Sequence, residues 1–269
     1  MSSINISGFT SKSGANFSKF VSEKLHDILD YEHEKVTSTS LKFSNDAKNY
    51  MAIGGSKLKY TFDGKEVSGI TSGTITSFKA VSEGQALLDI TKLSLAGKKL
   101  SNALDSGSTK TFLDTLLSGN DVIKATKYAD TFWGGAGNDT LYGYAGNDRL
   151  EGGAGADKLY GGAGADTFVF RSVKDSTVAA GGRDTIVDFS QTEKDRIDLK
   201  AIDADTTLAR NQAFSFIADK AFSKDAGELR YEKKGGDTFV HGDVDGDGKA
   251  DFSIRIDASI DFTKADFIL

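Results

Sequence analysis

Aspartates recur at every ninth position in the middle of the chain: Asp121, Asp130, Asp139, Asp148, Asp157 and Asp166. Apolar residues keep the same step, two positions after each aspartate: Ile123, Phe132, Leu141, Leu150, Leu159 and Phe168. Carboxylate oxygens in a flexible loop are the hard ligands that calcium requires. The spacing therefore predicts a repeat of nine residues with one calcium-binding carboxylate in each unit.

Between residues 134 and 169 the units read GGAGNDTLY, GYAGNDRLE, GGAGADKLY and GGAGADTFV, with no insertion. Because glycine adopts positive φ at little cost, the first six residues can form a tight turn whose carbonyl oxygens point inward. The last three can form a short strand with one apolar side chain facing a core. One such strand buries too little surface alone, so the units must stack. Stacking aligns the aspartates, and that column repels itself unless cations lie along it.

These units resemble the nonapeptide of the RTX (repeats-in-toxin) family, GGxGxDxUx, in which U is apolar. The resemblance implies a parallel β-roll over residues 118–170, with calcium held between the turns of units n and n+2. It implies that Asp139 faces Asp157 across one site. By the same step, Asp148 faces Asp166 across another.

Two units depart from this pattern. Tyr144 replaces the second glycine of its unit, and residues 125–130 contain no glycine. The predicted calcium ligands are aspartate carboxylates and carbonyl oxygens of the turns. They are Asp121, Asp130, Gly134, Ala136, Asp139, Tyr144, Gly146, Asp148, Gly153, Gly155, Asp157, Gly162, Gly164 and Asp166.

The composition agrees with a metal-stabilised protein. Cysteine is absent, which excludes a disulfide framework and leaves bound metal as the natural alternative. The net charge of −6 is unevenly distributed. Residues 1–117 carry +2, from 14 lysines and 12 acidic residues, and residues 118–269 carry −8, from 19 basic and 27 acidic residues, so the second part should attract cations and repel nucleic acid. The N-terminal stretch MSSINISGFTSKSG lacks the apolar region of a signal peptide, and no run is apolar enough for a membrane span.

Residues 1–117 are predicted to form an α+β domain of unknown ligand. Apolar spacing predicts an amphipathic helix over 16–31. An antiparallel meander should follow, with turns at Gly54-Gly55 and Asp63-Gly64. Its strands are predicted over 37–43, 48–53, 57–62, 67–81 and 87–95, and two short helices over 98–104 and 109–117.

Residues 171–269 resemble the C-terminal β domain that follows the β-roll in secreted serralysin-type metalloproteases. The motifs that carry the resemblance are GGAGADTFVF, DRIDLKAIDA, DGDGKADF and the final ADFIL. In that family the C-terminus belongs to an uncleaved type I secretion signal. The resemblance therefore implies export by type I secretion machinery to the cell exterior, without an N-terminal signal peptide.

A second acidic motif follows the spacing of an EF-hand loop. Asp243, Asp245, Asp247, Gly248 and Asp251 take its first, third, fifth, sixth and ninth places, but Ile254 replaces the final glutamate. The motif is open to two interpretations, an independent calcium loop or a turn between strands.

Catalytic signatures are absent from the sequence. The chain has three histidines, and His33-Glu34 lacks the second histidine of H-E-x-x-H because residue 37 is Thr37. There is no cysteine and no G-x-S-x-G motif. The main hypothesis is therefore a protein that is not an enzyme, whose N-terminal domain binds a ligand such as polysaccharide or a cell-surface structure. A polysaccharide-acting enzyme is the alternative, although no carboxylate pair stands out.

A haem-binding alternative concerns the N-terminal domain, whose element order resembles that of secreted haemophores. The predicted strand over 57–62 contains Tyr60, and a tyrosine phenolate can ligate haem iron. His33 is the candidate second ligand. An ordinary strand tyrosine is the competing interpretation of Tyr60.

Overall fold

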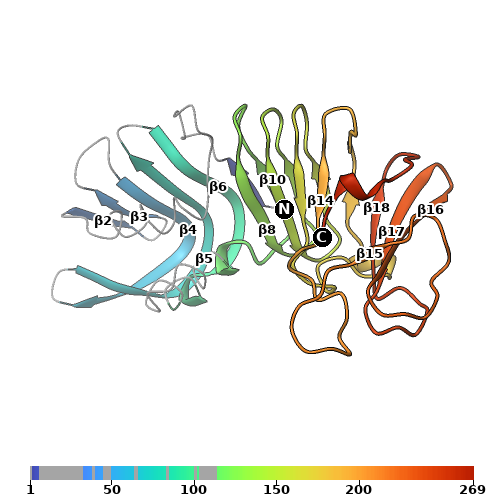
Figure 1. The fold of residues 1–269 in the computed structure, drawn as a ribbon. Helices are drawn as coiled ribbons and strands as arrows, with labels where there is room; N and C mark the ends of the chain where they lie inside the picture. Colours follow the sequence, from blue (N-terminus) through green and yellow to red (C-terminus); the bar gives the residue numbers. More distant parts are fainter. Residues whose placement is uncertain are drawn as a thin grey trace.

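The computed structural model describes residues 2–5, 33–37, 40–44, 50–63, 66–82, 85–99, 102 and 114–269. They form two sheets, one of 14 strands and one of five. In Figure 1 the coils of the middle of the chain stand side by side between a curved N-terminal meander and a C-terminal hairpin. Among the described residues, no helix has the length and apolar character needed to cross a membrane.

The repeat forms a parallel β-roll, as predicted, with strands alternating between two facing sheets. The first roll sheet, part of the 14-stranded sheet, contains β7 (Asp121–Lys124), β9 (Thr140–Tyr142), β11 (Lys158–Tyr160), β13 (Thr185–Ile186) and β18 (Phe252–Ile256). The second roll sheet contains β8 (Thr131–Ala136), β10 (Arg149–Ala154), β12 (Thr167–Val169), β14 (Arg196–Asp198) and β19 (Phe267–Ile268). Neighbouring strands within each roll sheet are parallel.

One apolar side chain from each strand faces the space between the two roll sheets. Ile123 is in register with Leu141, and Leu150 with Phe168, as a step of 18 residues requires. These inward side chains are at most 6% exposed: Ile123, Leu141, Leu159, Ile186 and Ile256 from the first sheet, and Phe132, Leu150, Phe168, Ile197 and Phe267 from the second.

The roll continues beyond residue 170, where the glycine repeat and the predicted roll both end. Ile186 pairs with Leu159, and Ile197 pairs with Phe168. In both added coils an aspartate stands two residues before the inward apolar residue, as in the repeat, but longer loops replace the glycine turns. The C-terminal segment therefore extends the same roll.

The N-terminal strands are β1 (Ser2–Asn5), β2 (His33–Thr37), β3 (Ser40–Ser44), β4 (Tyr50–Asp63), β5 (Glu66–Ser82) and β6 (Gln85–Ala96). The predicted antiparallel meander is present from β2 to β6. Asp63 pairs with Glu66 on either side of the predicted second turn. Besides strands, the described residues here include helical positions at 97–99, 102 and 114–116. The predicted helix over 16–31 lies outside the described residues, so the α+β class of this part is not shown.

Two local predictions in the meander are wrong. The strand predicted over 37–43 is instead a hairpin, in which Thr37 pairs with Ser40 and their hydroxyl oxygens lie 2.8 Å apart. Gly54-Gly55 is not a turn, because β4 runs through it with a shift in register against β5. A β-carbon at Gly55 would come within 3.0 Å of the Thr74 carbonyl and of Leu58, so close packing explains this glycine.

Strand β1 joins the meander to the roll. It pairs antiparallel with β6, with Ile4 opposite Ile90, and parallel with β7, with Ile4 opposite Ile123. Because of this insertion, one sheet runs from the meander into the first roll sheet across residue 117, the predicted domain boundary.

The C-terminal end caps the roll. Strands β15 (Ser215–Phe216), β16 (Glu228–Lys234) and β17 (Asp237–Asp243) continue the first roll sheet beyond β18. Short 3₁₀ helices η1 (Ala180–Gly182) and η2 (Lys264–Asp266) lie in the connections. Phe267 of β19 packs against Phe216 and Phe262, with ring centroids 5.2 and 5.3 Å apart. The tail predicted to carry the export signal is thus folded into the second roll sheet.

Candidate metal centre

The roll places its aspartates in two columns, one where the chain enters each roll sheet. The first aspartate column consists of Asp121, Asp139, Asp157 and Asp184, and the second consists of Asp130, Asp148, Asp166 and Asp195. All eight residues are at most 2% exposed. Asp184 and Asp195 were missed by the repeat pattern, although the apolar residue two positions after each is a signal that could have identified them.

One oxygen of each carboxylate builds the stack. In the first column, Asp139 Oδ1 accepts the Asp121 N–H at 2.8 Å, and Asp157 Oδ1 accepts the Asp139 N–H at 2.7 Å. Asp184 continues the series by accepting the Asp157 N–H at 2.9 Å. The second column repeats the arrangement at 2.7 to 2.8 Å, through Asp148, Asp166 and Asp195. The residue pairs expected to face each other are therefore stacked neighbours.

In five of the column aspartates the other carboxylate oxygen is buried without a donor. Within the described part of the chain, no hydrogen bond reaches Oδ2 of Asp139, Asp148, Asp157, Asp166 or Asp184. A buried carboxylate oxygen without a partner costs free energy. The roll therefore contains several oxygen atoms that a cation would satisfy.

Glycine at the first position of each repeat turn makes room for this oxygen. A β-carbon at Gly134 would come within 3.0 Å of Asp139 Oδ2 and of the Gly152 carbonyl oxygen. A β-carbon at Gly143 would meet Asp148 Oδ2 and the Gly161 carbonyl oxygen in the same way. Each of these glycines thus lies beside two oxygens: the Oδ2 atom of the aspartate in its own turn and the carbonyl oxygen of the glycine 18 residues later. Both are suitable calcium ligands.

The column aspartates have raised pKa values, as expected for buried carboxylates that lack a counter-ion. Burial raises the pKa of Asp139 to about 7, and repulsion from Asp157 adds to the rise. Burial raises the pKa of Asp148 to about 8, with Asp166 contributing repulsion. The pKa values of Asp157, Asp166 and Asp195 rise to about 6, and that of Asp184 also rises, mainly through burial. Without a counter-ion these sites favour protonated carboxyls.

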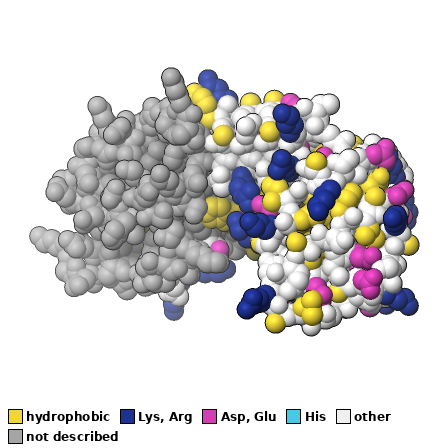
Figure 2. Space-filling view, in the orientation of Figure 1, with side chains coloured by type: hydrophobic (Ala, Val, Ile, Leu, Met, Phe, Trp, Pro, Cys, Tyr) yellow, Lys and Arg dark blue, Asp and Glu magenta, His cyan; other side chains and the backbone are white. Residues whose placement is uncertain are grey.

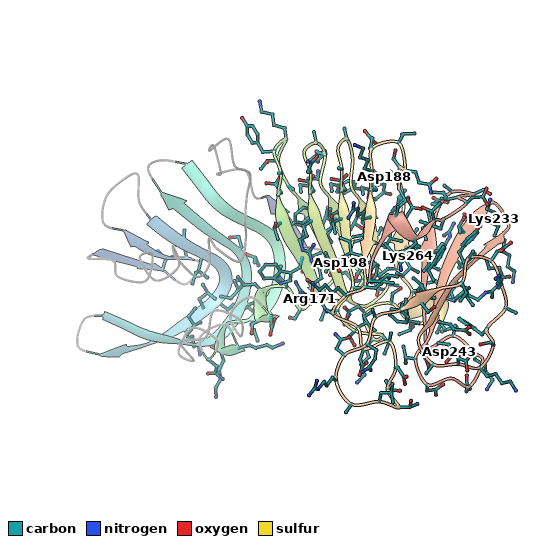
Figure 3. The ribbon with its side chains drawn as sticks, in the orientation of Figure 1. Arg171, Asp188, Asp198, Lys233, Asp243 and Lys264 are labelled. Atoms are coloured by element: carbon teal, nitrogen blue, oxygen red, sulfur yellow. The ribbon has the colours of Figure 1, made fainter. Side chains whose placement is uncertain are left out.

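The remaining predicted ligands lie in the turns or in the strand ends that lead into them. Gly146, Gly153, Gly155, Gly162 and Gly164 all have positive φ, as a tight turn requires. Gly134 and Ala136 lie at the end of β8. Beyond the repeat, the Asp188 carboxylate accepts the N–H groups of Gly161 and Gly162 at 2.9 and 3.0 Å, at the turn end of the roll (Figure 3).

Tyr144 is strained where the repeat expects glycine. Its φ is 74°, against 93° for Gly162 in the corresponding place, and its side chain is 48% exposed. A side chain in this left-handed region costs about 1–2 kcal/mol, and glycine returns about 0.5–1 kcal/mol through its larger unfolded-state entropy. We expect Tyr144→Gly to stabilise the calcium-loaded protein by about 0.5–1 kcal/mol in urea unfolding. A loss of stability would mean that stacking on Tyr142, at 6.0 Å, outweighs the strain.

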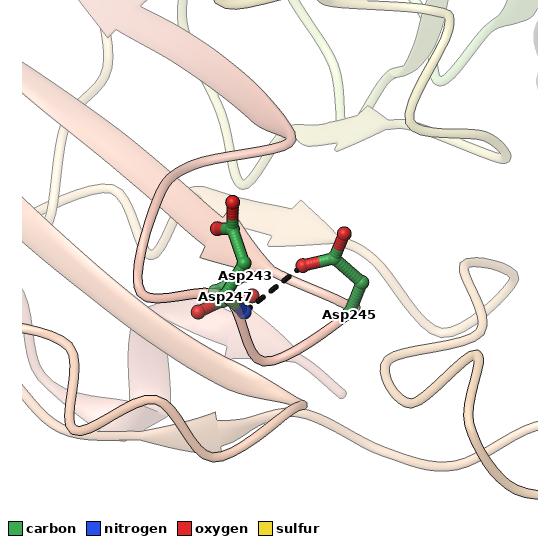
Figure 4. A group of neighbouring side chains, drawn as sticks. All are labelled: Asp243, Asp245 and Asp247. Carbon is green, nitrogen blue, oxygen red and sulfur yellow. Dashed lines mark hydrogen bonds between the residues drawn. The ribbon is translucent and has the colours of Figure 1, made fainter.

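The Asp243 loop connects β17 to β18, so the interpretation as a turn between strands describes its structure. Asp243 is fully buried, and its two oxygens accept the N–H groups of Gly246 and Gly248. Asp245 accepts the Asp247 N–H at 3.0 Å, as Figure 4 shows. Oxygens of Asp243, Asp245 and Asp247 lie within 4.8 Å of one another. Unlike the Oδ2 atoms of the glycine turns, both Asp243 oxygens already have donors.

The haem candidates do not come together. His33 pairs with Ser44, which pairs with Tyr50, so His33 lies level with Tyr50. Tyr60 lies in the same strand as Tyr50, about 30 Å further along it at roughly 3.3 Å per residue. Ligands of one haem iron must converge on it, and strand pairing keeps these two apart.

The buried aspartates of the columns are separate from the acidic side chains exposed on the surface. On the face shown in Figure 2, acidic side chains gather over the C-terminal end, whereas lysine and arginine side chains are spread across the middle. The column aspartates are buried beneath the turns.

Two solved structures are similar to part of this chain. The solution structure of the AlgE6R3 subunit of the Azotobacter vinelandii mannuronan C5-epimerase is 30% identical, covering 52% of this chain and 71% of that chain, with a TM-score of 0.37. The AlgE6R2 subunit of the same enzyme is 28% identical, covering 56% of this chain and 88% of that chain, with a TM-score of 0.43. A search of curated proteins gives no match.

Residues 108–269 match the family described as Peptidase M10 serralysin C terminal. The match covers more than half of the chain and includes both aspartate columns and the capping strands. The parallel roll, its nine-residue register and this match lead to one conclusion: the chain belongs to the serralysin C-terminal family, with an RTX-type repeat domain at its centre.

Proposed function

We propose that this protein binds calcium along its two aspartate columns and that the ions hold the roll together. The observation that carries the proposal is the set of buried Oδ2 atoms without donors, at Asp139, Asp148, Asp157 and Asp166. A cation beside each would replace the missing hydrogen bond and offset the repulsion within each column.

The chemistry of the donor set favours calcium over other metals. The candidate ligands are carboxylate and carbonyl oxygens; the sequence has no cysteine, and residues 118–195 contain no histidine. Transition metals prefer nitrogen or sulfur ligands, and magnesium requires a nearly ideal octahedron that keeps several waters. Flexible turns that offer many oxygens match the larger and more variable coordination shell of calcium.

Calcium dependence fits a protein that works outside the cell. Extracellular calcium modules have dissociation constants of about 10⁻⁴ to 10⁻³ M, so cytosolic calcium leaves them empty. The chain would stay largely unfolded inside, pass a type I exporter and fold when external calcium shifts the equilibrium. Secretion by this route follows from the C-terminal similarity and is part of the proposal.

The N-terminal meander is proposed to bind a partner, without catalysis. Extracellular polysaccharide or a cell-surface structure is the proposed ligand. Calcium-dependent retention of the full chain on exopolysaccharide, lost in chelator, would support this role. Release of soluble sugar during the assay would instead identify a polysaccharide-acting enzyme.

Calcium titration of two matched variants tests the metal proposal. Asp157 is stacked between Asp139 and Asp184, whereas Asp121 is bonded at the end of its column. We expect Asp157→Asn, which keeps an oxygen for the Asp139 N–H, to weaken calcium binding at least about tenfold, or about 1.4 kcal/mol. Asp121→Asn should have a smaller effect.

Isothermal titration calorimetry measures both variants against the unchanged chain. Equal losses would place the ions in a different register. Absence of calcium binding by the unchanged chain would refute the proposed function.

A further inference from the structure

The turn at residues 125–130 differs from the four glycine turns at its first position. There Ala125 replaces the glycine found at residues 134, 143, 152 and 161. At each of those glycines, a β-carbon would come within 3.0 Å of the Oδ2 atom of the aspartate in the same turn. A carboxylate cannot take that position beside Ala125, because the alanine methyl group occupies the space.

The Asp130 carboxylate instead turns to Thr126. Asp130 Oδ2 accepts the Thr126 N–H at 2.6 Å and the Thr126 hydroxyl at 2.8 Å. Thr126 Oγ1 also accepts the Tyr128 N–H at 3.1 Å, which directs the hydroxyl proton toward Asp130. The oxygen that has no donor in the four glycine turns therefore has two donors here.

We infer that Thr126 closes this turn in place of a cation, so that the second aspartate column begins with a turn that needs no calcium. The inference rests on the proposed function. Two hydrogens already point at Asp130 Oδ2, and a cation at that oxygen would face the positive ends of both dipoles. Asp130 keeps its place in the stack, because its N–H donates to Asp148 Oδ1 at 2.7 Å. Thr126 thus makes the first turn of this column a cap for the ion-binding turns that follow.

A graft of the glycine turn tests the inference by gain of function. Replacing the sequence ATKYA at residues 125–129 with GGAGN gives Asp130 the surroundings of Asp139. Native mass spectrometry of the full chain in calcium should then count one ion more than in the unchanged protein. In the reciprocal variant, Gly143→Ala with Tyr144→Thr, the count should fall by one.

A milder variant covers the case in which the graft does not fold. Asp130→Asn keeps an oxygen for Thr126, and its ion count should equal that of the unchanged chain. A lower count would overturn the inference, because it would place an ion at Asp130. A folded graft with an unchanged count would also overturn it. If the unchanged chain holds no calcium, the proposed function fails first, and the two failures are therefore distinguishable.

Discussion

Transfer of the protein from millimolar calcium into excess chelator at pH 8 should unfold the roll. Burial and mutual repulsion raise the pKa values of Asp139 and Asp148 to about 7 and 8, yet at pH 8 much of each column is ionised. Uncompensated buried carboxylates are strongly destabilising. A site with a dissociation constant of about 10⁻⁴ M contributes about 1.4 kcal/mol in millimolar calcium, so the loss of several sites removes much of the roughly 5–15 kcal/mol that stabilises a typical folded protein.

Hydrogen exchange can follow this unfolding at single amides. The N–H groups of Asp139, Asp148 and Asp157 donate to the next aspartate in their column and should be protected in calcium. Chelator should abolish their protection. The N–H of Thr126, which donates to Asp130 Oδ2 within a single turn, is the internal comparison and should lose less protection. Unchanged exchange at all four amides would refute a role for the ion in holding the roll.

Acid should partly replace calcium, which is the second large effect. The column aspartates have folded-state pKa values of about 6 to 8, above the usual 3.8. Between these values the folded chain binds protons that the unfolded chain has released, so stability falls as pH rises. The contribution is fully present below about pH 3.8 and lost as pH passes about 6 to 8. Each pKa unit corresponds to about 1.4 kcal/mol.

Thermal unfolding in chelator at pH 5 and at pH 8 measures this effect. At pH 5 the calcium-free roll should show a melting transition, whereas at pH 8 it should melt at a lower temperature or already be unfolded. Asp148→Asn, which removes the group with a pKa of about 8, should reduce the difference, whereas Asp219→Asn on the surface should not. A calcium-free protein that is more stable at pH 8 would contradict the buried columns.

His241 opposes this trend and has to be separated from it. Burial lowers its pKa to about 4, and Arg230 and Arg183 add repulsion. Its contribution is present above the ordinary value of 6.5 and is lost as pH falls toward about 4. His241→Phe removes this pH dependence, and the phenylalanine ring can keep the stacked contact with Phe239.

The repeat region could be predicted from the sequence because its geometry is periodic. Each unit adds the same turn and the same short strand, so a step of nine residues places every aspartate and every inward apolar side chain. Leu141 and Leu159 pair as that step requires, and Asp139 stacks on Asp157. The calcium chemistry predicted for the columns followed from the same local pattern.

The structure alone showed which oxygens of the columns already have donors. Whether Asp130 Oδ2 accepts the two Thr126 bonds depends on the alanine methyl group and on the neighbouring coil, which a repeat pattern does not encode. Asp184 and Asp195 join the columns at sequence separations of 27 and 29 residues from Asp157 and Asp166, instead of the regular step of 18. The apparent turn at Gly54-Gly55 is a continuous strand because its neighbours pack closely there.

Local spacing in the sequence is enough to predict the period and the positions of the aspartates and inward apolar residues, and the C-terminal motifs are enough to recognise the family resemblance. Pairing between distant strands, seen only in the folded chain, places β1 between β6 and β7, extends the roll to Phe267 and keeps His33 apart from Tyr60. Those features depend on pairing between strands far apart in the chain. Such pairing is set by the packing and hydrogen bonding of the whole sheet rather than by any segment alone.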